Sequence, residues 1–199
     1  MGPRRTNGRA GGEGGEPGAA SPRPALLVVD VQRAYFERDP RPDDADGVIG
    51  RVNDLVGRAR EAGAPVILIQ HEDAGDGTGF GSAGWELAGG LGAMPADPRI
   101  RKTTPDSFHH TGLLEFLRRL GVGWLVVCGY ATEYCVDTTT RRGSALGFPV
   151  ALASDAHTTH DKPHASAAQI RTHHNRILPE VGSYGPAVDV VPARDIRFG

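Results

Sequence analysis

Apolar runs alternate with amphipathic segments along most of the chain. Short runs rich in valine, isoleucine and leucine predict strands that are buried on both faces, and they lie at residues 25–32, 65–70, 125–127, 148–153 and 187–191. A shorter and more polar strand is predicted at residues 99–103. Apolar positions recur at helical spacing over residues 48–62, 112–120 and 164–178. This alternation predicts an α/β fold with a parallel sheet and right-handed crossovers.

Two kinds of segment fall outside this pattern. Residues 1–24 are mostly glycine, proline, arginine, glutamate, serine and alanine, with little to bury, and are expected to form a disordered tail before a single domain at 25–199. Residues 74–98 are glycine-rich, and a loop of this length is usually functional or mobile. Its Trp85 either walls a pocket or anchors a small satellite core.

Composition narrows the class of protein. The 199 residues carry 22 basic and 24 acidic side chains, and no basic stripe is present, so a nucleic-acid partner is not expected. Two cysteines do not make a disulfide framework, which favours a reducing, cytoplasmic location. Since no apolar run reaches the ~18 residues of a membrane span, no membrane partner is expected either.

The segment 125–142 carries the main chemical signal. Gly129 ends an apolar strand, and Thr132 is a reasonable N-cap for a helix that follows. Cys135 is then expected in the first helical turn, where the helix dipole favours a thiolate, the reactive form of cysteine. The alternative is a buried small hydrophobe, as most lone cysteines are. Cys128 lies inside the strand and is expected to be that.

Two further candidates lie at strand ends on the same predicted edge of the sheet. Asp30 ends the first strand and Lys102 ends the third. A carboxylate can take the proton of a thiol, and an ammonium can stabilise the thiolate, so Asp30, Lys102 and Cys135 together suit attack on a carbonyl carbon. Alone, Asp30 reads equally well as a turn or N-cap residue, and Lys102 as a solvated surface lysine.

The histidines do not predict a metal site. His71, Glu72 and Asp73 are adjacent on an extended chain and point in opposite directions, so few of them could share one ion. His173 and His174 diverge by ~100° on a helix. We therefore predict no metal and no cofactor.

Four segments together resemble the isochorismatase-like cysteine hydrolase superfamily, which includes nicotinamidases and N-carbamoylsarcosine amidases. They are residues 27–32, 102–108, 127–139 and 154–157. The resemblance implies a three-layer, doubly wound fold with a six-stranded, mostly parallel sheet, and a homo-oligomer. It maps the family's Asp-Lys-Cys triad onto Asp30, Lys102 and Cys135, and its oxyanion hole onto the N–H groups of Ala131 and Cys135. It also maps a non-proline cis peptide bond onto Tyr130–Ala131.

The resemblance further implies hydrolysis of a C–N bond, in an amide, carbamoyl group or lactam of a small molecule, through a covalent thioester. Where nicotinamidases of this group carry an Asp-x-His metal motif, this chain has Gln70, His71 and Glu72. The candidate substrate contacts are Phe36, Gln70, Glu72, Trp85, Tyr130 and Tyr134.

Three other functions are compatible with the same residues. The first is a vinyl-ether hydrolase of the isochorismatase type, with Asp30 as the acid; such enzymes commonly lack the cysteine. The second is a binding protein that kept the fold without turnover. The third is a redox sensor based on Cys135, for which Cys128, inside a buried strand, is a poorly placed partner.

Overall fold

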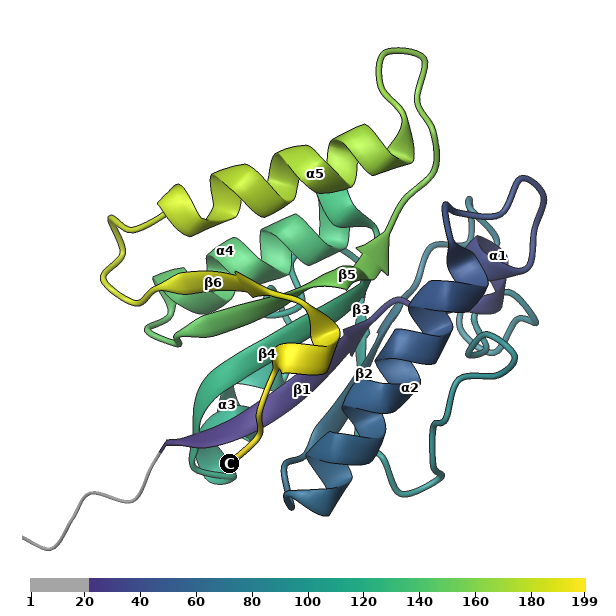
Figure 1. The fold of residues 1–199 in the computed structure, drawn as a ribbon. Helices are drawn as coiled ribbons and strands as arrows, with labels where there is room; N and C mark the ends of the chain where they lie inside the picture. Colours follow the sequence, from purple (N-terminus) through teal and green to yellow (C-terminus); the bar gives the residue numbers. More distant parts are fainter. Residues whose placement is uncertain (1–21) are drawn as a thin grey trace, which may run out of the picture.

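A computed structural model describes residues 22–199, which form a six-stranded sheet flanked by helices (Figure 1). The strands are β1 (Arg23–Val29), β2 (Val66–His71), β3 (Arg99–Lys102), β4 (Val122–Tyr130), β5 (Val150–Thr158) and β6 (Val188–Val191). Every pairing is parallel, and the spatial order is β3-β2-β1-β4-β5-β6. The order reverses at β1, as in a doubly wound sheet. The α/β, six-stranded prediction is confirmed.

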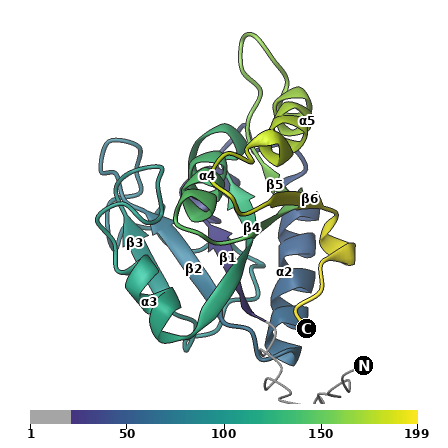
Figure 2. The ribbon, with the colours of Figure 1, turned by 90° about the vertical axis from the view of Figure 1, so that its left-hand side faces the viewer.

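Helices cover both faces of the sheet (Figures 1 and 2). They are α1 (Arg33–Phe36), α2 (Ala45–Glu61), α3 (Leu113–Arg119), α4 (Asp137–Ala145) and α5 (Ala167–Ile177), with a π-helical turn η1 (Thr132–Val136) and the 3-10 turns η2 (Leu178–Glu180) and η3 (Ala193–Asp195). In residues 22–199, no helix is both long enough and apolar enough to cross a bilayer.

Two hydrophobic clusters hold the three layers together. Leu26 and Val28 of β1 pack towards α2 and the C-terminal segment. Leu27 and Val29 pack on the other face, towards α3 and η1, the turn that follows β4. Because both faces of β1 are covered, the strand is apolar throughout instead of alternating. This is why the sequence places the central strands well.

Several predicted boundaries differ from the observed ones. β1 begins at Arg23, so residues 23–24 belong to the strand and not to a tail; residues 1–21 lie outside the described part. β1 also ends at Val29, before Asp30. β5 continues past residue 153 to Thr158. α5 begins at Ala167 instead of 164 because Ser166 caps it, in a reciprocal capping box with Gln169.

Candidate active site

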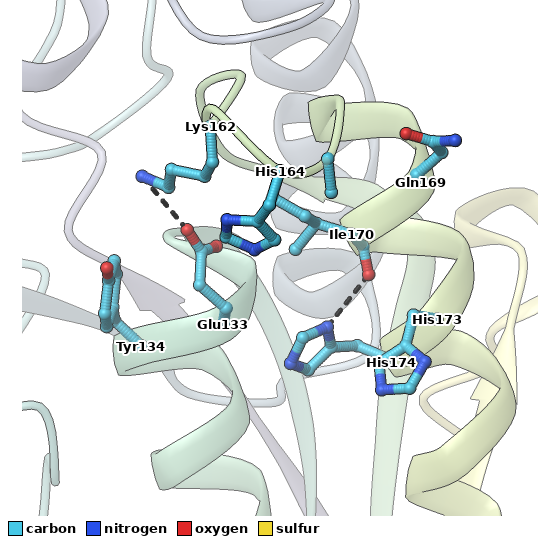
Figure 3. Close-up of a pocket in the computed structure, with 9 residues that line it drawn as sticks. Glu133, Tyr134, Lys162, His164, Gln169, Ile170, His173 and His174 are labelled. Carbon is cyan, nitrogen blue, oxygen red and sulfur yellow. Dashed lines mark hydrogen bonds and ion pairs between the residues drawn. The ribbon is translucent and has the colours of Figure 1, made fainter.

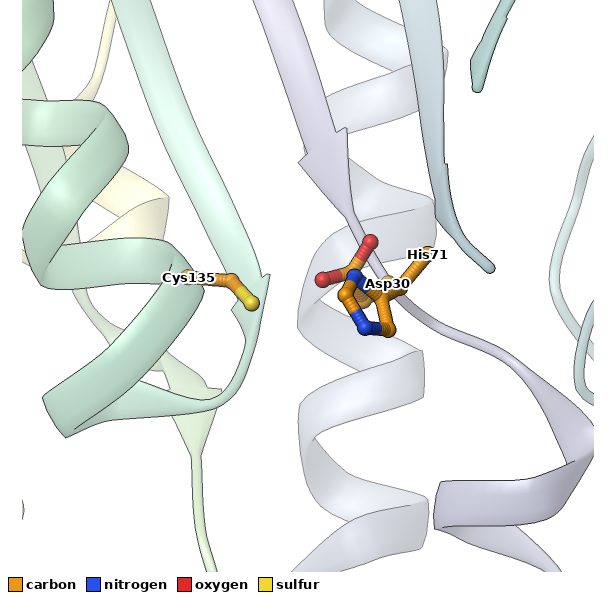
Figure 4. Close-up of side chains that lie close together, drawn as sticks. All are labelled: Asp30, His71 and Cys135. Carbon is orange, nitrogen blue, oxygen red and sulfur yellow. The ribbon is translucent and has the colours of Figure 1, made fainter. Parts of the chain in front are cut away.

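Consecutive strands deliver four polar side chains to one edge of the sheet. Asp30 follows β1, His71 and Lys102 end β2 and β3, and Cys135 lies in η1 after β4. Parallel strands present their carboxyl ends on the same side, so these side chains gather at one edge of the sheet. Figure 4 draws Asp30, His71 and Cys135 of this group. A cavity of about 430 Å³ opens over them. Its lining residues are Asp30, Tyr35, His71, Asp73, Asp76, Thr103, Pro105, Tyr130, Ala131, Tyr134 and Cys135.

The ammonium of Lys102 connects the other three groups. Its Nζ lies 2.6 Å from Oδ2 of Asp30, 3.1 Å from Sγ of Cys135 and 3.2 Å from Nδ1 of His71. An ammonium has three hydrogens and accepts none, so each hydrogen has one acceptor here. His71 therefore carries its lone pair on Nδ1 in this arrangement. The structure thus brings Lys102 into direct contact with both Asp30 and Cys135, and adds His71.

Charge and burial set the protonation of the group. Burial alone would lower the pKa of Lys102, but the charge of Asp30 and the hydrogen bonds to Asp30 and Cys135 outweigh burial and raise it. Burial, reinforced by the charge of Asp30, raises the pKa of Cys135 to about 12, although Lys102 opposes this shift. The resting sulfur is therefore a neutral thiol. The expectation of a thiolate stabilised by a helix dipole is wrong because desolvation dominates.

The second oxygen of Asp30 is available to take the thiol proton. Oδ2 binds Lys102, whereas Oδ1 is buried and has no hydrogen-bond partner within residues 22–199. The backbone at Asp30 adopts a left-handed conformation with φ of 50°, which non-glycine residues rarely adopt.

Cys135 lies in a π-helical turn and not in the first turn of an α-helix. The N-cap is Ala131, whose carbonyl accepts the N–H groups of Tyr134 and Val136, each at 3.1 Å. The expected N-cap, Thr132, is the first residue of the turn and makes no capping bond. The peptide bond between Tyr130 and Ala131 is cis.

Four of the six predicted substrate contacts do not line the cavity. Phe36 is fully buried in the core and meets the edge of Tyr130. The amide of Gln70 donates to the carbonyl of Trp85, which is itself buried against Phe80.

Glu72 is also directed elsewhere, into an ion pair with Arg101. Tyr130, Ala131 and Tyr134, by contrast, do line the cavity, and Tyr134 is 52% exposed. Two of the six predicted contacts therefore remain candidates, together with the predicted oxyanion-hole residue Ala131.

The predicted site residues leave out six of the lining residues: Tyr35, His71, Asp73, Asp76, Thr103 and Pro105. Tyr35 stacks on Tyr130 with 4.8 Å between ring centroids, and its hydroxyl donates to Asp76 at 2.8 Å. The sequence only sorts the residues after β2 into two sets, because residues two apart on an extended chain share a side. His71 and Asp73 form one such pair, and the chosen Gln70 and Glu72 form the other.

Potential metal-ligand atoms of His71, Asp73 and Asp76 lie within 4.8 Å of one another, as do those of Asp30, His71 and Cys135. Both sets share His71, whose Nδ1 already accepts from the Lys102 ammonium. A divalent cation there would face that buried positive charge. The residues therefore fit a metal poorly, and we assign no step to one.

A second cavity, of about 510 Å³, shares Tyr134 with the first. It lies between η1 and α5, where Glu133 forms an ion pair with Lys162 at 3.2 Å (Figure 3). His173 and His174 of α5 contribute to its lining. None of the three predicted catalytic side chains reaches it, so the smaller cavity is the candidate active site.

Comparison with known proteins identifies the family. The family model of the isochorismatase domain matches residues 24–177, and the chain belongs to this family. A solved structure of an isochorismatase family protein superposes with a TM-score of 0.77 at 33% identity, covering 84% of this chain and 97% of that one.

Several curated relatives carry a named activity. A streptothricin hydrolase of Streptomyces noursei is 41% identical over 152 residues, which are 75% of this chain and 60% of that protein. The ureidoacrylate amidohydrolase RutB of Stutzerimonas stutzeri is 33% identical over 171 residues, covering 67% of this chain and 69% of RutB. The chain thus spans less than two thirds of the streptothricin hydrolase.

Proposed function

We propose that this protein is a cysteine hydrolase that cleaves a C–N bond of a small molecule through a covalent thioester. The observation that carries the proposal is the contact of one thiol, one carboxylate and one ammonium at the base of a cavity. These three groups supply a nucleophile, a general base and a fixed positive charge.

In the acylation step, Oδ1 of Asp30 accepts the Cys135 thiol proton as the sulfur attacks the carbonyl carbon. A C–S bond forms, and the carbonyl electron pair moves to oxygen, where the N–H groups of Ala131 and Cys135 donate to it. Each such donor is worth about 3 kcal/mol at the barrier. The tetrahedral intermediate then collapses. The C–N bond breaks as Asp30 gives its proton to the departing nitrogen, which leaves as an amine or ammonia.

In the deacylation step, Asp30 takes a proton from water, and the resulting hydroxide attacks the thioester carbon. The C–S bond breaks, the sulfur regains the proton from Asp30, and the carboxylic acid leaves. Lys102 keeps its charge throughout. It balances the single negative charge that passes between Asp30, the sulfur and the oxyanion.

The substrate class is supported by the cavity and by the relatives. A volume of about 430 Å³ suits a small molecule. The curated relatives include an amidohydrolase, RutB, and a nicotinamidase of Arabidopsis thaliana. An amide, carbamoyl compound or lactam is consistent with both names.

The alternatives fit the site less well. A vinyl-ether hydrolase needs an acid but no thiol, and would leave the contact of Lys102 with Cys135 without a purpose. A redox pair of Cys135 with Cys128 is disfavoured because Cys128 is fully buried and packs in the cluster on the α2 side of the sheet, whereas Cys135 packs on the other side. A binding protein would have no need of a buried base beside the thiol.

A panel of amides, carbamoyl compounds and lactams, assayed for release of ammonia or amine, tests the proposal. We expect at least one compound to be hydrolysed and Cys135→Ser to lose ~10³-fold or more of the rate. Intact-mass analysis with an electrophilic amide analogue should find one adduct, on Cys135. Amide turnover that survives Cys135→Ala would contradict the thioester scheme, whereas hydrolysis of an isochorismate-like vinyl ether that survives it would indicate the ether hydrolase. Folded protein without any adduct would contradict every scheme in which the Cys135 thiol reacts.

A further inference from the structure

A buried histidine that takes no part in the proposed chemistry contacts η1, the turn that carries Cys135. His157 is fully buried, near the end of β5. Its Nδ1 lies 2.8 Å from Oγ1 of Thr132, the first residue of η1, and its Nε2 lies 2.9 Å from Oδ1 of Asn175 on α5. One imidazole ring therefore connects the last strand before α5, the helix itself and the turn that carries Cys135.

The donor and the acceptor of each hydrogen bond in this series can be worked out from the last bond, which Asn175 makes to Ser154. Nδ2 of Asn175 donates to the carbonyl of Ser154 at 2.9 Å, so Oδ1 is the atom that faces His157. An amide oxygen only accepts, so Nε2 of His157 carries the hydrogen. A neutral imidazole then has a lone pair on Nδ1, and the Thr132 hydroxyl must donate to it. Every hydrogen bond from the Thr132 hydroxyl, through His157 and Asn175, to the Ser154 carbonyl therefore has a defined donor and acceptor.

The fold bends β5 to make this contact. Val127 pairs with Leu152, but Gly129, two residues later, pairs with His157, five residues later. The bulge accounts for three extra residues and places the histidine opposite the end of β4, next to the turn. Bulges recur next to active sites, where they redirect a side chain.

Thr132 uses its hydroxyl on this histidine instead of capping its own helix. Its side chain is fully buried and makes no cap bond, although threonine at a helix start commonly does so. The residue directly follows Ala131 and opens the turn that ends with Cys135 and Val136. The hydrogen bond to His157 therefore anchors the residue that joins Ala131 to the rest of the turn.

We propose that Asn175, His157 and Thr132 form a positioning relay that holds the N–H groups of Ala131 and Cys135 towards the cavity for acyl transfer. This inference rests on the proposed cysteine hydrolase function. His157 and Asn175 touch no reacting atom in it; they act through the Thr132 hydroxyl.

The surroundings keep the relay in one state. Burial lowers the pKa of His157 to about 4, and Arg171 and His174 of α5 act in the same direction, whereas Asn175 and Asp155 oppose it. The ring is therefore neutral near pH 7. It can accept from Thr132 and donate to Asn175 at the same time.

Two reagents that modify Cys135 distinguish a loss of N–H positioning from a general structural defect. Acetylation of Cys135 by p-nitrophenyl acetate passes through an oxyanion, whereas alkylation by iodoacetamide does not. Both rates are read at Cys135 by intact mass, with Cys135→Ser as background. The variants are Thr132→Val, which removes the hydroxyl at similar volume, and Thr132→Ser, which restores it. Thr140→Val is the matched control, because the Thr140 hydroxyl is buried without a hydrogen-bond partner among residues 22–199.

We expect Thr132→Val to lower the acetylation rate by about tenfold or more, while alkylation stays within about twofold of the unmodified protein. Thr132→Ser should restore acetylation, and Thr140→Val should change neither rate. Equal loss of both rates in Thr132→Val, or no loss of acetylation, overturns the relay. If the unmodified protein is not acetylated at Cys135 at all, the proposed function fails and takes the relay with it.

A second variant tests the relay without removing the hydroxyl. In Asn175→Asp, a carboxylate beside Nε2 raises the pKa of His157, and a protonated ring cannot accept from Thr132. The ratio of acetylation to alkylation should then fall as pH is lowered from 8 to 6, while the unmodified protein keeps a constant ratio. A ratio independent of pH in the variant contradicts the relay, because a purely structural defect would not titrate.

Discussion

Nζ of Lys102 lies 2.6 Å from Oδ2 of Asp30, and the two side chains are 0% and 1% exposed. Charges this deeply buried are tolerated only when each is paired, because desolvation of a single ion costs several kcal/mol. The pair thus fixes the ionised carboxylate next to the Cys135 thiol. It also makes the site sensitive to removal of either partner.

A double-mutant cycle measures this dependence. We expect Asp30→Asn and Lys102→Met each to lower the free energy of unfolding by about 3 kcal/mol, because each leaves a buried charge without its partner. The double variant should lose clearly less than the sum of the two. Urea unfolding at pH 7.5, followed by circular dichroism, gives the three values.

Arg101→Met is the matched control for that cycle. Arg101 precedes Lys102 on β3 and pairs with Glu72, but half of its side chain is exposed. Loss of a solvent-screened pair should change stability far less than loss of the buried one. Additive losses at Asp30 and Lys102 would mean that the two charges are not energetically coupled.

Buried His157 predicts loss of stability in mild acid. Burial lowers its pKa from the usual 6.5 to about 4, so between these values the unfolded chain binds a proton that the native chain does not. The contribution of His157 to the free energy of unfolding is therefore fully present above pH 6.5, and about 3 kcal/mol is lost as pH drops towards 4. His71, whose pKa is also lowered by burial and then by Lys102, acts in the same direction.

Unfolding curves collected from pH 7.5 to 4.5 check this sign. His157→Gln should have a shallower decline than the unmodified protein, whatever its stability at pH 7.5. His173→Gln, at an exposed histidine of α5, should keep the full decline. The same slope in all three proteins would show that His157 is not the group that titrates.

The backbone around Gly129 leaves no room for the methyl group of an alanine. Its φ is 118°, and a Cβ there would overlap the carbonyl oxygen of Val29 in the neighbouring strand. Because backbone cannot move aside as a side chain can, Gly129→Ala should lower the free energy of unfolding by more than about 3 kcal/mol.

Gly57→Ala provides the contrast for Gly129. Gly57 lies inside α2, and nothing lies within 4 Å of the position its Cβ would take. Alanine there should raise stability by about 0.5–1 kcal/mol. Thermal or urea unfolding of both variants suffices, and a mild effect at Gly129 would indicate that β1 and β4 can separate without cost.

The sequence predicted the sheet and the meeting place of Asp30, Lys102 and Cys135 for one physical reason. Strands buried on both faces are apolar throughout, so their ends are visible as the first polar residues, and parallel strands bring those ends together. This reason applies to Asp30. Lys102 instead ends the short, polar strand β3, and its position at a strand end together with the family resemblance singled it out, although lysines are seldom buried.

The same property hid the rest of the site. A strand without alternation does not reveal which of its residues face the cavity, so β2 gave no basis for choosing His71 and Asp73 over Gln70 and Glu72. The hydrogen bond from Thr132 to His157 depends on a bulge in β5 that no local sequence pattern predicts. The protonation of Cys135 depends on burial, which is a property of the whole fold.

Charge at the cavity predicts a preference among substrates. Besides Asp30, the carboxylates of Asp73 and Asp76 line it. Burial opposes ionisation of Asp76, but hydrogen bonds from Thr78 and Tyr35 outweigh burial and lower its pKa. Asp76 is therefore negative at neutral pH, and an amide that carries an ammonium group should bind more tightly than a neutral amide of the same shape.

Protection of Cys135 from iodoacetamide measures this preference without requiring turnover. We expect 4-aminobutanamide to protect at a concentration about fivefold lower than pentanamide, the ratio that ~1 kcal/mol of partly screened attraction gives. Asp76→Asn should bring the two concentrations together, and salt should act likewise. Asp189→Asn, at an exposed aspartate of β6, changes the net charge equally and should keep the difference. Equal protection by both amides in the unmodified protein would rule out selection by these carboxylates.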